Sequence, residues 1–168
     1  MTTPTPKQQF IEGFTREIAT TLRVLGAYPK DKLDLRPAPK CKTARELAWL
    51  FAMEQGMLEK AITTGFDWSV PMPASPKAPE SMAAIIKAID DGHKRVIGIV
   101  NGMRDEQLFE TIKFPVAPKT IGDVPKIQFL WMLLCDQIHH RGQFSIYLRM
   151  ADGKLPSIYG PTADEPWF

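Results

Sequence analysis

The sequence predicts an all-α protein that folds as a four-helix bundle. Four segments carry apolar side chains at spacings of three and four positions, which places those side chains on one face of a helix. Proline-rich stretches separate the segments, and no segment has a convincing strand pattern. The chain has 168 residues, the length of one typical domain, so we expect residues 1–168 to form a single helical bundle.

The first two helices are expected at residues 7–27 and at about residues 43–64. Thr43 and Glu46 have the spacing of a capping box, in which each side chain binds a backbone amide of the other residue. We therefore expect the second helix to begin there. Apolar residues line one face of the first helix: Phe10, Ile11, Phe14, Ile18, Leu22 and Leu25. The inner face of the second helix carries Leu47, Leu50, Phe51, Glu54, Met57, Leu58 and Ile62.

The third helix is expected to begin near Ser81 and to end near Met103. A short amphipathic piece at residues 105–111 should follow it. Residues 111–114 have a weak β character, but Pro115 and Pro118 break the run. We therefore expect a loop or a short irregular extended segment at this point.

The last long helix is expected to begin within residues 121–126 and to end near Met150. Gly153 suits the left-handed conformation that ends many helices. Arg149 lies near the helix end, where a positive charge complements the helix dipole. The tail, residues 155–168, is rich in proline and aromatic residues, and we expect it to pack back onto the bundle as an ordered coil.

Composition limits the classes of function. The formal charge is only +2 and the basic residues are scattered, which argues against a nucleic-acid-binding surface. No apolar run reaches about 18 residues and the N-terminal segment lacks a signal-peptide core, so we expect no membrane span and a cytoplasmic location. The two cysteines, Cys41 and Cys135, form neither a disulfide scaffold nor a metal framework. Cys135 ends an apolar run and is expected to be a buried thiol.

The segment DQIHHRGQFSIYLR contains two of the three histidines of the chain. Asp136 and His140 are four positions apart, so both lie on one face of the last helix. A pair with this spacing can ligate one metal ion between facing helices. Zinc normally needs a third protein ligand, which must come from another helix. His93, the remaining histidine, is expected to be exposed and is not a candidate ligand.

The same spacing fits a second interpretation without a metal. A carboxylate beside an imidazole can form a hydrogen-bonded pair inside the bundle, which raises the pKa of the histidine and selects its tautomer. His139 and Gln143 are also four positions apart. Arg141 lies on a different face from His140, where it is expected to pair with a carboxylate or to hold the tail. Spacing alone leaves the metal site and the polar pair both open.

Two longer segments carry a resemblance to a known family. HHRGQFSIYLRMADGKLPSIYGPTADEP and the upstream KTARELAW resemble the DinB-like family, also called DinB/YfiT-like metalloenzymes. The resemblance spans about residues 10–165. It implies a four-helix bundle in an up-down-down-up order with a long crossover, and homodimers in many members.

The resemblance also implies a divalent ion, often nickel or zinc, held by three side chains. His140 and Asp136 match the two ligands on the last helix of the family. Leu50 stands where the family carries a histidine on the second helix, and a leucine side chain cannot ligate a metal. Glu54 lies one turn further along that helix and is expected to act as a third ligand or as a general base.

The residues next to the expected ligands should support them. His139, Arg141 and Gln143 are expected to surround the metal ligands and to hold the tail. A cation at such a site lowers the pKa of a bound thiol, which suits a thiol transferase, and the same site suits a hydrolase.

Two classes of function therefore follow. The first is a metal-dependent thiol transferase or hydrolase with a degenerate metal site. The alternative is a non-catalytic bundle that binds a small-molecule ligand or serves as a structural dimer. Phe129, Trp131 and Met132 are candidates for the interface of such a dimer.

Overall fold

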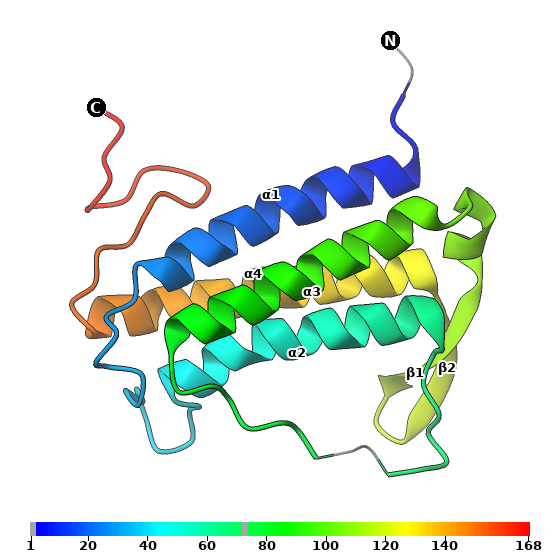
Figure 1. Ribbon diagram of the computed structural model, residues 1–168, viewed down its shortest axis with the longest axis horizontal. Coiled ribbons are helices and arrows are strands. Elements are labelled where there is room, and N and C mark those ends of the chain that lie inside the picture. Colours follow the sequence, from blue (N-terminus) through cyan, green and yellow to red (C-terminus); the bar gives the residue numbers. More distant parts are fainter. Residues whose placement is uncertain (1–2, 72–73) are drawn as a thin grey trace.

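The computed structural model describes residues 3–71 and 74–168 (Figure 1). Four long helices dominate it, and a short 3-10 helix and a two-stranded antiparallel hairpin lie between the third and fourth helices. The elements in chain order are α1 (Pro6–Gly26), α2 (Ala44–Thr63), α3 (Met82–Gly102), η1 (Asp105–Phe109), β1 (Thr111–Ala117), β2 (Thr120–Pro125) and α4 (Lys126–Met150).

Hydroxyl side chains define where the first three helices begin. Thr43 accepts from the backbone N–H of Glu46 at 3.2 Å, and Glu46 accepts from the backbone N–H of Thr43 at 2.7 Å. The predicted capping box is therefore confirmed. Thr5 and Gln8 form a second capping box before α1, and the Ser81 hydroxyl caps α3. Each cap satisfies an amide that the helix leaves without a partner.

The helices pack so that α1 and α2 each contact both α3 and α4. In Figure 1, α1 and α4 run from right to left, whereas α2 and α3 run from left to right. Because α2 and α3 run in the same direction, the segment between them returns along the molecule (Figure 1). Aromatic side chains fill the space between the helices, and five are fully buried: Phe10, Phe14, Phe51, Phe129 and Phe144.

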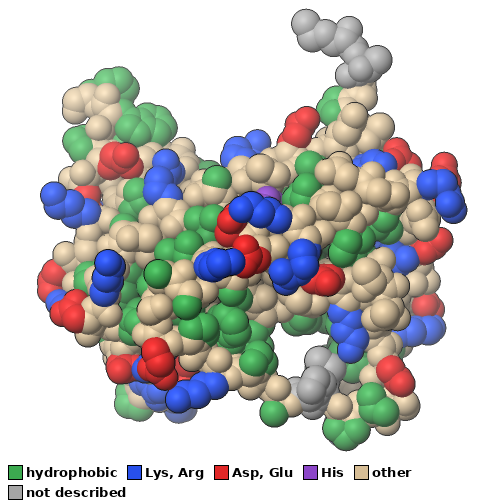
Figure 2. Space-filling view, viewed as in Figure 1, with side chains coloured by type: hydrophobic (Ala, Val, Ile, Leu, Met, Phe, Trp, Pro, Cys, Tyr) green, Lys and Arg blue, Asp and Glu red, His purple; other side chains and the backbone are tan. Residues whose placement is uncertain are grey.

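The prediction of a dimer interface at Phe129 is wrong, because this side chain lies in the core. Trp131 and Met132 are different, since 38% and 41% of their surfaces remain exposed. On the face in Figure 2, basic and acidic side chains are interspersed, without a large area of one sign. None of the helices within the described residues combines the length and the apolar character that a membrane span requires.

The hairpin of β1 and β2 corrects the all-α prediction, which placed a loop here. Pro115 lies opposite Ile121, and the pairing is irregular between Pro115 and Ala117. Lys119 adopts a left-handed conformation with a φ of 59° in the turn. Proline is tolerated in a strand that has a free edge, and this two-stranded sheet offers one on each strand.

Side chains from the rest of the molecule hold the hairpin in place. The Phe114 ring lies 4.8 Å from the Phe129 ring and 5.5 Å from the Phe66 ring, between centroids. The Trp68 indole N–H donates to the carbonyl of Lys113 at 2.7 Å. Since an isolated hairpin is marginal in water, these contacts explain why the strands form despite their prolines.

The C-terminal tail packs back onto the helices, as expected. Asp152, and not the predicted Gly153, takes the left-handed conformation after α4, with a φ of 61°. Arg149 binds the carboxylate of Asp164, and Arg23 donates to the carbonyl of Ser157. These contacts tie the tail to the ends of α1 and α4.

A buried ion pair between Arg141 of α4 and Glu17 of α1 forms the centre of this packing. Arg141 is 1% exposed and donates to Glu17 Oε2 at 2.6 Å, to the Glu17 carbonyl at 2.9 Å and to the Thr21 hydroxyl at 3.3 Å. The Tyr159 hydroxyl of the tail accepts from Arg141 at 2.6 Å and donates to Glu17 Oε2 at 2.7 Å. The expected pairing of Arg141 with a carboxylate and with the tail is confirmed.

The ion pair also sets the acid–base behaviour of Glu17. Burial acts to raise the pKa of this carboxyl, but the hydrogen bonds from Arg141 and Tyr159 outweigh burial and hold the pKa below its ordinary value. Because the pKa is lower in the folded state, Glu17 stabilises the fold above its ordinary pKa and loses this contribution as the pH falls through the folded value.

Replacing Glu17 with alanine should strongly destabilise the protein, because it leaves the Arg141 guanidinium buried without a carboxylate. We expect Glu17→Ala to lower the free energy of unfolding by about 3–5 kcal/mol in urea denaturation at pH 7. Tyr159→Phe should cost only about 1 kcal/mol, since it removes hydrogen bonds and leaves the ion pair.

The control is Asp91→Ala, which breaks an exposed pair with Lys87 on α3. An exposed pair of this kind contributes less than about 1 kcal/mol. If Glu17→Ala cost no more than Asp91→Ala, the buried pair would not hold α1 and α4 together.

Candidate metal centre

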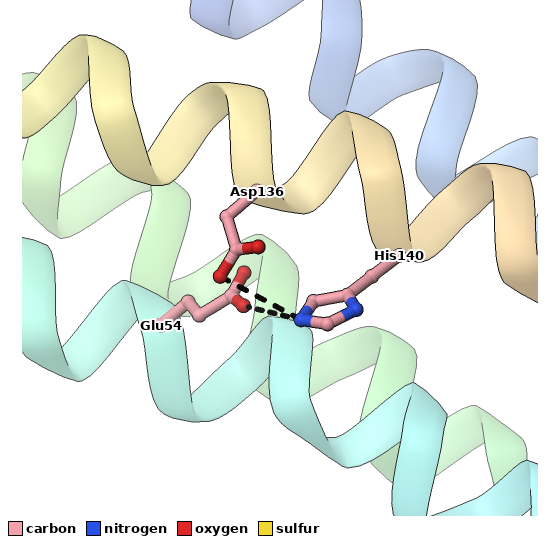
Figure 3. A group of neighbouring side chains, drawn as sticks. All are labelled: Glu54, Asp136 and His140. Atoms are coloured by element: carbon pink, nitrogen blue, oxygen red, sulfur yellow. Dashed lines mark ion pairs between the residues drawn. The ribbon is translucent and has the colours of Figure 1, made fainter.

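Three potential ligand side chains meet between α2 and α4 (Figure 3). Glu54 comes from α2, and Asp136 and His140 lie one turn apart on α4. His140 Nε2 is 3.4 Å from Glu54 Oε1 and 3.6 Å from Asp136 Oδ2, and the three ligand atoms all lie within 4.8 Å of one another. Within residues 3–71 and 74–168, no other group of three or more His, Cys, Asp or Glu residues meets this distance.

The three side chains form a gradient from the interior to the surface. The side chain of Glu54 is 8% exposed, that of His140 18% and that of Asp136 49%. The alternative of a buried, hydrogen-bonded pair of Asp136 and His140 is therefore not what forms, because Asp136 is half exposed and its contact with His140 is too long for a hydrogen bond.

Burial gives Glu54 unusual properties for a carboxyl group. Loss of solvation, reinforced by the negative charge of Asp136, raises the pKa of Glu54 to about 8. Its Oε2 atom is buried and has no hydrogen-bond partner. No positive charge offsets the loss of solvation at Glu54, so without a bound cation this carboxyl group is mainly protonated at neutral pH.

Gln143 orients the two neighbouring histidines. Its amide oxygen lies 3.1 Å from His140 Nδ1, and its amide nitrogen lies 2.9 Å from His139 Nε2. An amide oxygen can only accept, so this arrangement places the proton of His140 on Nδ1. The Nε2 lone pair of His140 then faces Glu54 and Asp136, which is the tautomer that a metal ligand needs.

Leu50 lies one turn before Glu54 on α2 and presents an apolar side chain to the same region. It lines a cavity of about 700 Å³ beside the three ligands and a second cavity of about 480 Å³ that Gln143 also lines. His140 lines both cavities, so it stands between them. The centre is therefore accessible to a small molecule.

Two expectations about single residues are wrong. Cys135 is exposed and lines the larger cavity, because the face of α4 that carries Asp136 opens to it. His93 is only 9% exposed and packs against Phe14, with 4.6 Å between ring centroids. Burial lowers the pKa of His93, and its Nδ1 has no partner. Neither residue joins the three ligands, and the contacts of Arg141 lie on the α1 side of α4.

Two buried glutamines next to the centre were not predicted. Gln55 follows Glu54 and Gln137 follows Asp136 in sequence, and the Gln55 amide N–H donates to Gln137 Oε1 at 3.4 Å. Both are about 1% exposed. The sequence could have indicated these two glutamines, because each is a polar residue next to an expected ligand on a helix with an apolar inner face.

These features define a class of protein. It is a mainly helical protein that carries two carboxylates and one imidazole, arranged as a candidate site for one metal ion between two helices. The sequence model of the DinB superfamily matches residues 14–144, and the chain belongs to that superfamily.

Comparisons with individual proteins agree with this assignment. The chain is 27% identical over 161 residues to the uncharacterized protein YrdA of Bacillus subtilis (strain 168), which covers 93% of this chain and 89% of that protein. The crystal structure of a DinB-like protein from Bacillus cereus ATCC 10987 is similar with a TM-score of 0.70 and 22% identity, over 89% of this chain and 95% of that chain.

A DinB-like protein from Bacillus subtilis, YjoA, has a TM-score of 0.67 and 18% identity, over 89% of this chain and 96% of that chain. At these identities, the two crystal structures support the fold and leave the chemistry of the site to its own residues.

The raised pKa of Glu54 predicts a pH-dependent stability for the metal-free protein. Between the ordinary pKa of 4.5 and the folded value of about 8, the folded state binds more protons than the unfolded state. The free energy of unfolding should therefore fall as the pH rises through this window. Glu54→Gln should remove this part of the pH dependence, a difference of a few kcal/mol in urea denaturation with a chelator present.

The control for this prediction is Glu12→Gln, since the Glu12 side chain is exposed on α1. This variant should follow the wild-type pH profile. Parallel profiles for wild type and Glu54→Gln would contradict the raised pKa.

Proposed function

We propose that Glu54, Asp136 and His140 hold one divalent cation and that the protein is a metal-dependent thiol transferase or hydrolase. The observation that carries this proposal is the buried carboxyl group of Glu54, which lines a cavity: its Oε2 atom has no hydrogen-bond partner, and its Oε1 atom lies 3.4 Å from His140 Nε2. A buried carboxylate is costly without a positive partner, and a cation would remove that cost.

The distances between the side chains support this proposal. Ligand atoms that surround a tetrahedral ion at about 2.1 Å lie about 3.4 Å from one another. The separations of His140 Nε2 from Glu54 Oε1 and from Asp136 Oδ2 are 3.4 Å and 3.6 Å. These two separations match those around one small cation, and all three ligand atoms lie within 4.8 Å of one another.

The chemistry of the donors also suits a catalytic ion. Three protein ligands with a remaining open position are typical of catalytic zinc sites. Two oxygens and one nitrogen suit zinc, nickel, manganese or iron, and zinc and nickel are the ions that the family resemblance implied. Leu50 in place of a second histidine makes the set richer in oxygen and weaker for nitrogen-preferring ions.

The residues at the proposed site would have different roles. A cation bound there would lower the pKa of a thiol or a water molecule and so supply a nucleophile at neutral pH. Gln143 keeps the Nε2 lone pair of His140 directed at the site. Glu54 would supply a buried negative charge to hold the cation, and half-exposed Asp136 would lie on the side open to a substrate.

The two helices that carry the site, α2 and α4, run in opposite directions (Figure 1). We propose that the four helices form a bundle in the up-down-down-up order, and their directions in Figure 1 support this order.

A non-catalytic role in binding a small ligand is the second candidate function, because the cavity of about 700 Å³ has the size of a small-molecule site. The half-exposed Trp131 and Met132 support a homodimer as a third proposal.

Metal content tests the main proposal directly. Protein purified without chelator and incubated with nickel or zinc should contain about one ion per chain by elemental mass spectrometry. His140→Ala should lose this ion, because it removes the only nitrogen ligand. His139→Ala is the matched control and should keep it, since His139 is not one of the three ligands and its side chain contacts Gln143 instead. Stoichiometric metal in His140→Ala, or none in the wild type, would refute the site.

Leu50 offers a test in the opposite direction. Leu50→His should add a second imidazole one turn from Glu54 and raise the affinity for zinc or nickel by on the order of tenfold or more. Competition with a chromophoric chelator would measure the affinity. Leu50→Ala is the control and should stay within about twofold of wild type. An unchanged affinity in Leu50→His would mean that position 50 does not face the ion.

A further inference from the structure

The larger cavity beside the metal centre has mainly apolar walls, with Cys135 and His139 as the other lining residues besides the three candidate ligands. Throughout this section, "the cavity" means the space of about 700 Å³ that Glu54, Asp136 and His140 line at one end. Its walls are formed by the apolar side chains of Leu50, Met53, Met57, Phe114, Met132 and Leu133. They come from α2, β1 and α4, so the fold assembles this surface from three separate elements.

We propose that the cavity selects substrates whose body is uncharged and apolar and whose one polar group points to the metal centre. This inference rests on the proposed function and specifies the substrate class for the same site. It excludes small anionic substrates, such as those with several carboxylates.

The first observation is the distribution of charge around the cavity. Among the described residues that line it, none is a lysine or an arginine, whereas two are carboxylates. An anionic substrate body would therefore lose its hydration without gaining a counter-ion. Nearby cations are engaged elsewhere: Lys113 binds Asp123 at 2.8 Å, and Lys60 lies 5.7 Å from the centre of the Phe66 ring.

Basic residues do line a neighbouring hollow, in contrast to this cavity. A neighbouring hollow of about 400 Å³ near the start of α2 is lined by Lys42, Arg45 and Lys77. Leu50 and Met53 line both spaces, so the two are adjacent. The chain therefore places cations close by, but it leaves them out of the cavity that reaches the metal centre.

The second observation is the thioether content of the walls. Met53 and Met57 lie one turn apart on α2, and Met132 lies on α4. Methionine side chains are flexible and polarisable, and they adapt to apolar ligands of different shapes. The walls therefore suit a range of apolar bodies, while the polar end fixes the orientation.

The test compares two thiols that share a head group and differ in the charge of their bodies. Benzyl mercaptan has an uncharged body, and mercaptosuccinate carries two carboxylates. Each would be titrated into protein with 13C-labelled methionine methyl groups, in a reducing buffer. Benzyl mercaptan should shift the methyl signals of Met53, Met57 and Met132 and bind at least about tenfold more tightly than mercaptosuccinate. The signal of Met82, which is buried at the start of α3, should stay in place.

A cation placed in the wall should reverse the preference. Met57→Lys should weaken the binding of benzyl mercaptan and strengthen the binding of mercaptosuccinate, because the lysine supplies a counter-ion for the carboxylates. Met150→Lys is the matched control, since Met150 is 48% exposed at the end of α4 and should leave both affinities unchanged. Mercaptosuccinate binding as tightly as benzyl mercaptan to the wild type, or shifts outside the three cavity methionines, would overturn the proposal.

Measuring both the metal-free and the nickel-loaded protein separates this inference from the proposed function. The preference for benzyl mercaptan in a protein that binds no metal would support the cavity proposal and refute the metal site. A protein that binds one ion but prefers mercaptosuccinate would keep the metal site and overturn the substrate class.

Discussion

The buried guanidinium of Arg141 constrains the rest of the molecule. Removing a guanidinium from water is costly, and only a nearly complete set of partners offsets that cost. Here α1 supplies a carboxylate, a carbonyl and a hydroxyl, and the tail supplies Tyr159. These partners restrict the rotation of α4 about its own axis. Since His140 precedes Arg141 by one residue, about 100° around the helix, fixing Arg141 towards α1 also sets the direction of His140 towards α2.

The candidate metal centre places a second polar group in the interior, on the side of α4 that faces α2. Glu54 is buried with one unpartnered oxygen, and Gln55 and Gln137, which follow Glu54 and Asp136 in sequence, form a buried polar contact. Close packing of α3 encloses this layer, because a Cβ atom added at Gly92 would lie 2.6 Å from Cβ of Gln55. Enclosure raises the pKa of a carboxyl group, and a charged carboxylate held there lowers the stability of the fold. The fold therefore keeps a destabilising group at the place where a cation would be most strongly attracted.

Local patterns explain which features the sequence predicts and which it misses. Helix periodicity, the Thr43 capping box and the spacing of Asp136 and His140 depend only on neighbours within about one turn. The hairpin depends on Phe114 meeting Phe66 and Phe129, which are distant in the chain. Pairing Glu54 with α4 is likewise non-local and came from the family resemblance. His93 could have been placed correctly, since it follows Ile89 by four positions and precedes Val96 by three, and both are buried.

Leu50 connects the two properties that distinguish this site. Relative to the ligand set that the family resemblance implies, its side chain lacks a nitrogen ligand, which would leave two oxygens and one imidazole and would lower the affinity for borderline metal ions. The same side chain adds an apolar surface to the cavity that those ligands line. A histidine here would supply a stronger metal site and a more polar wall at once. In the function proposed here, metal affinity and substrate selection would therefore be coupled through one position, because the side chain that withholds a nitrogen ligand is also the one that lines the cavity with apolar surface.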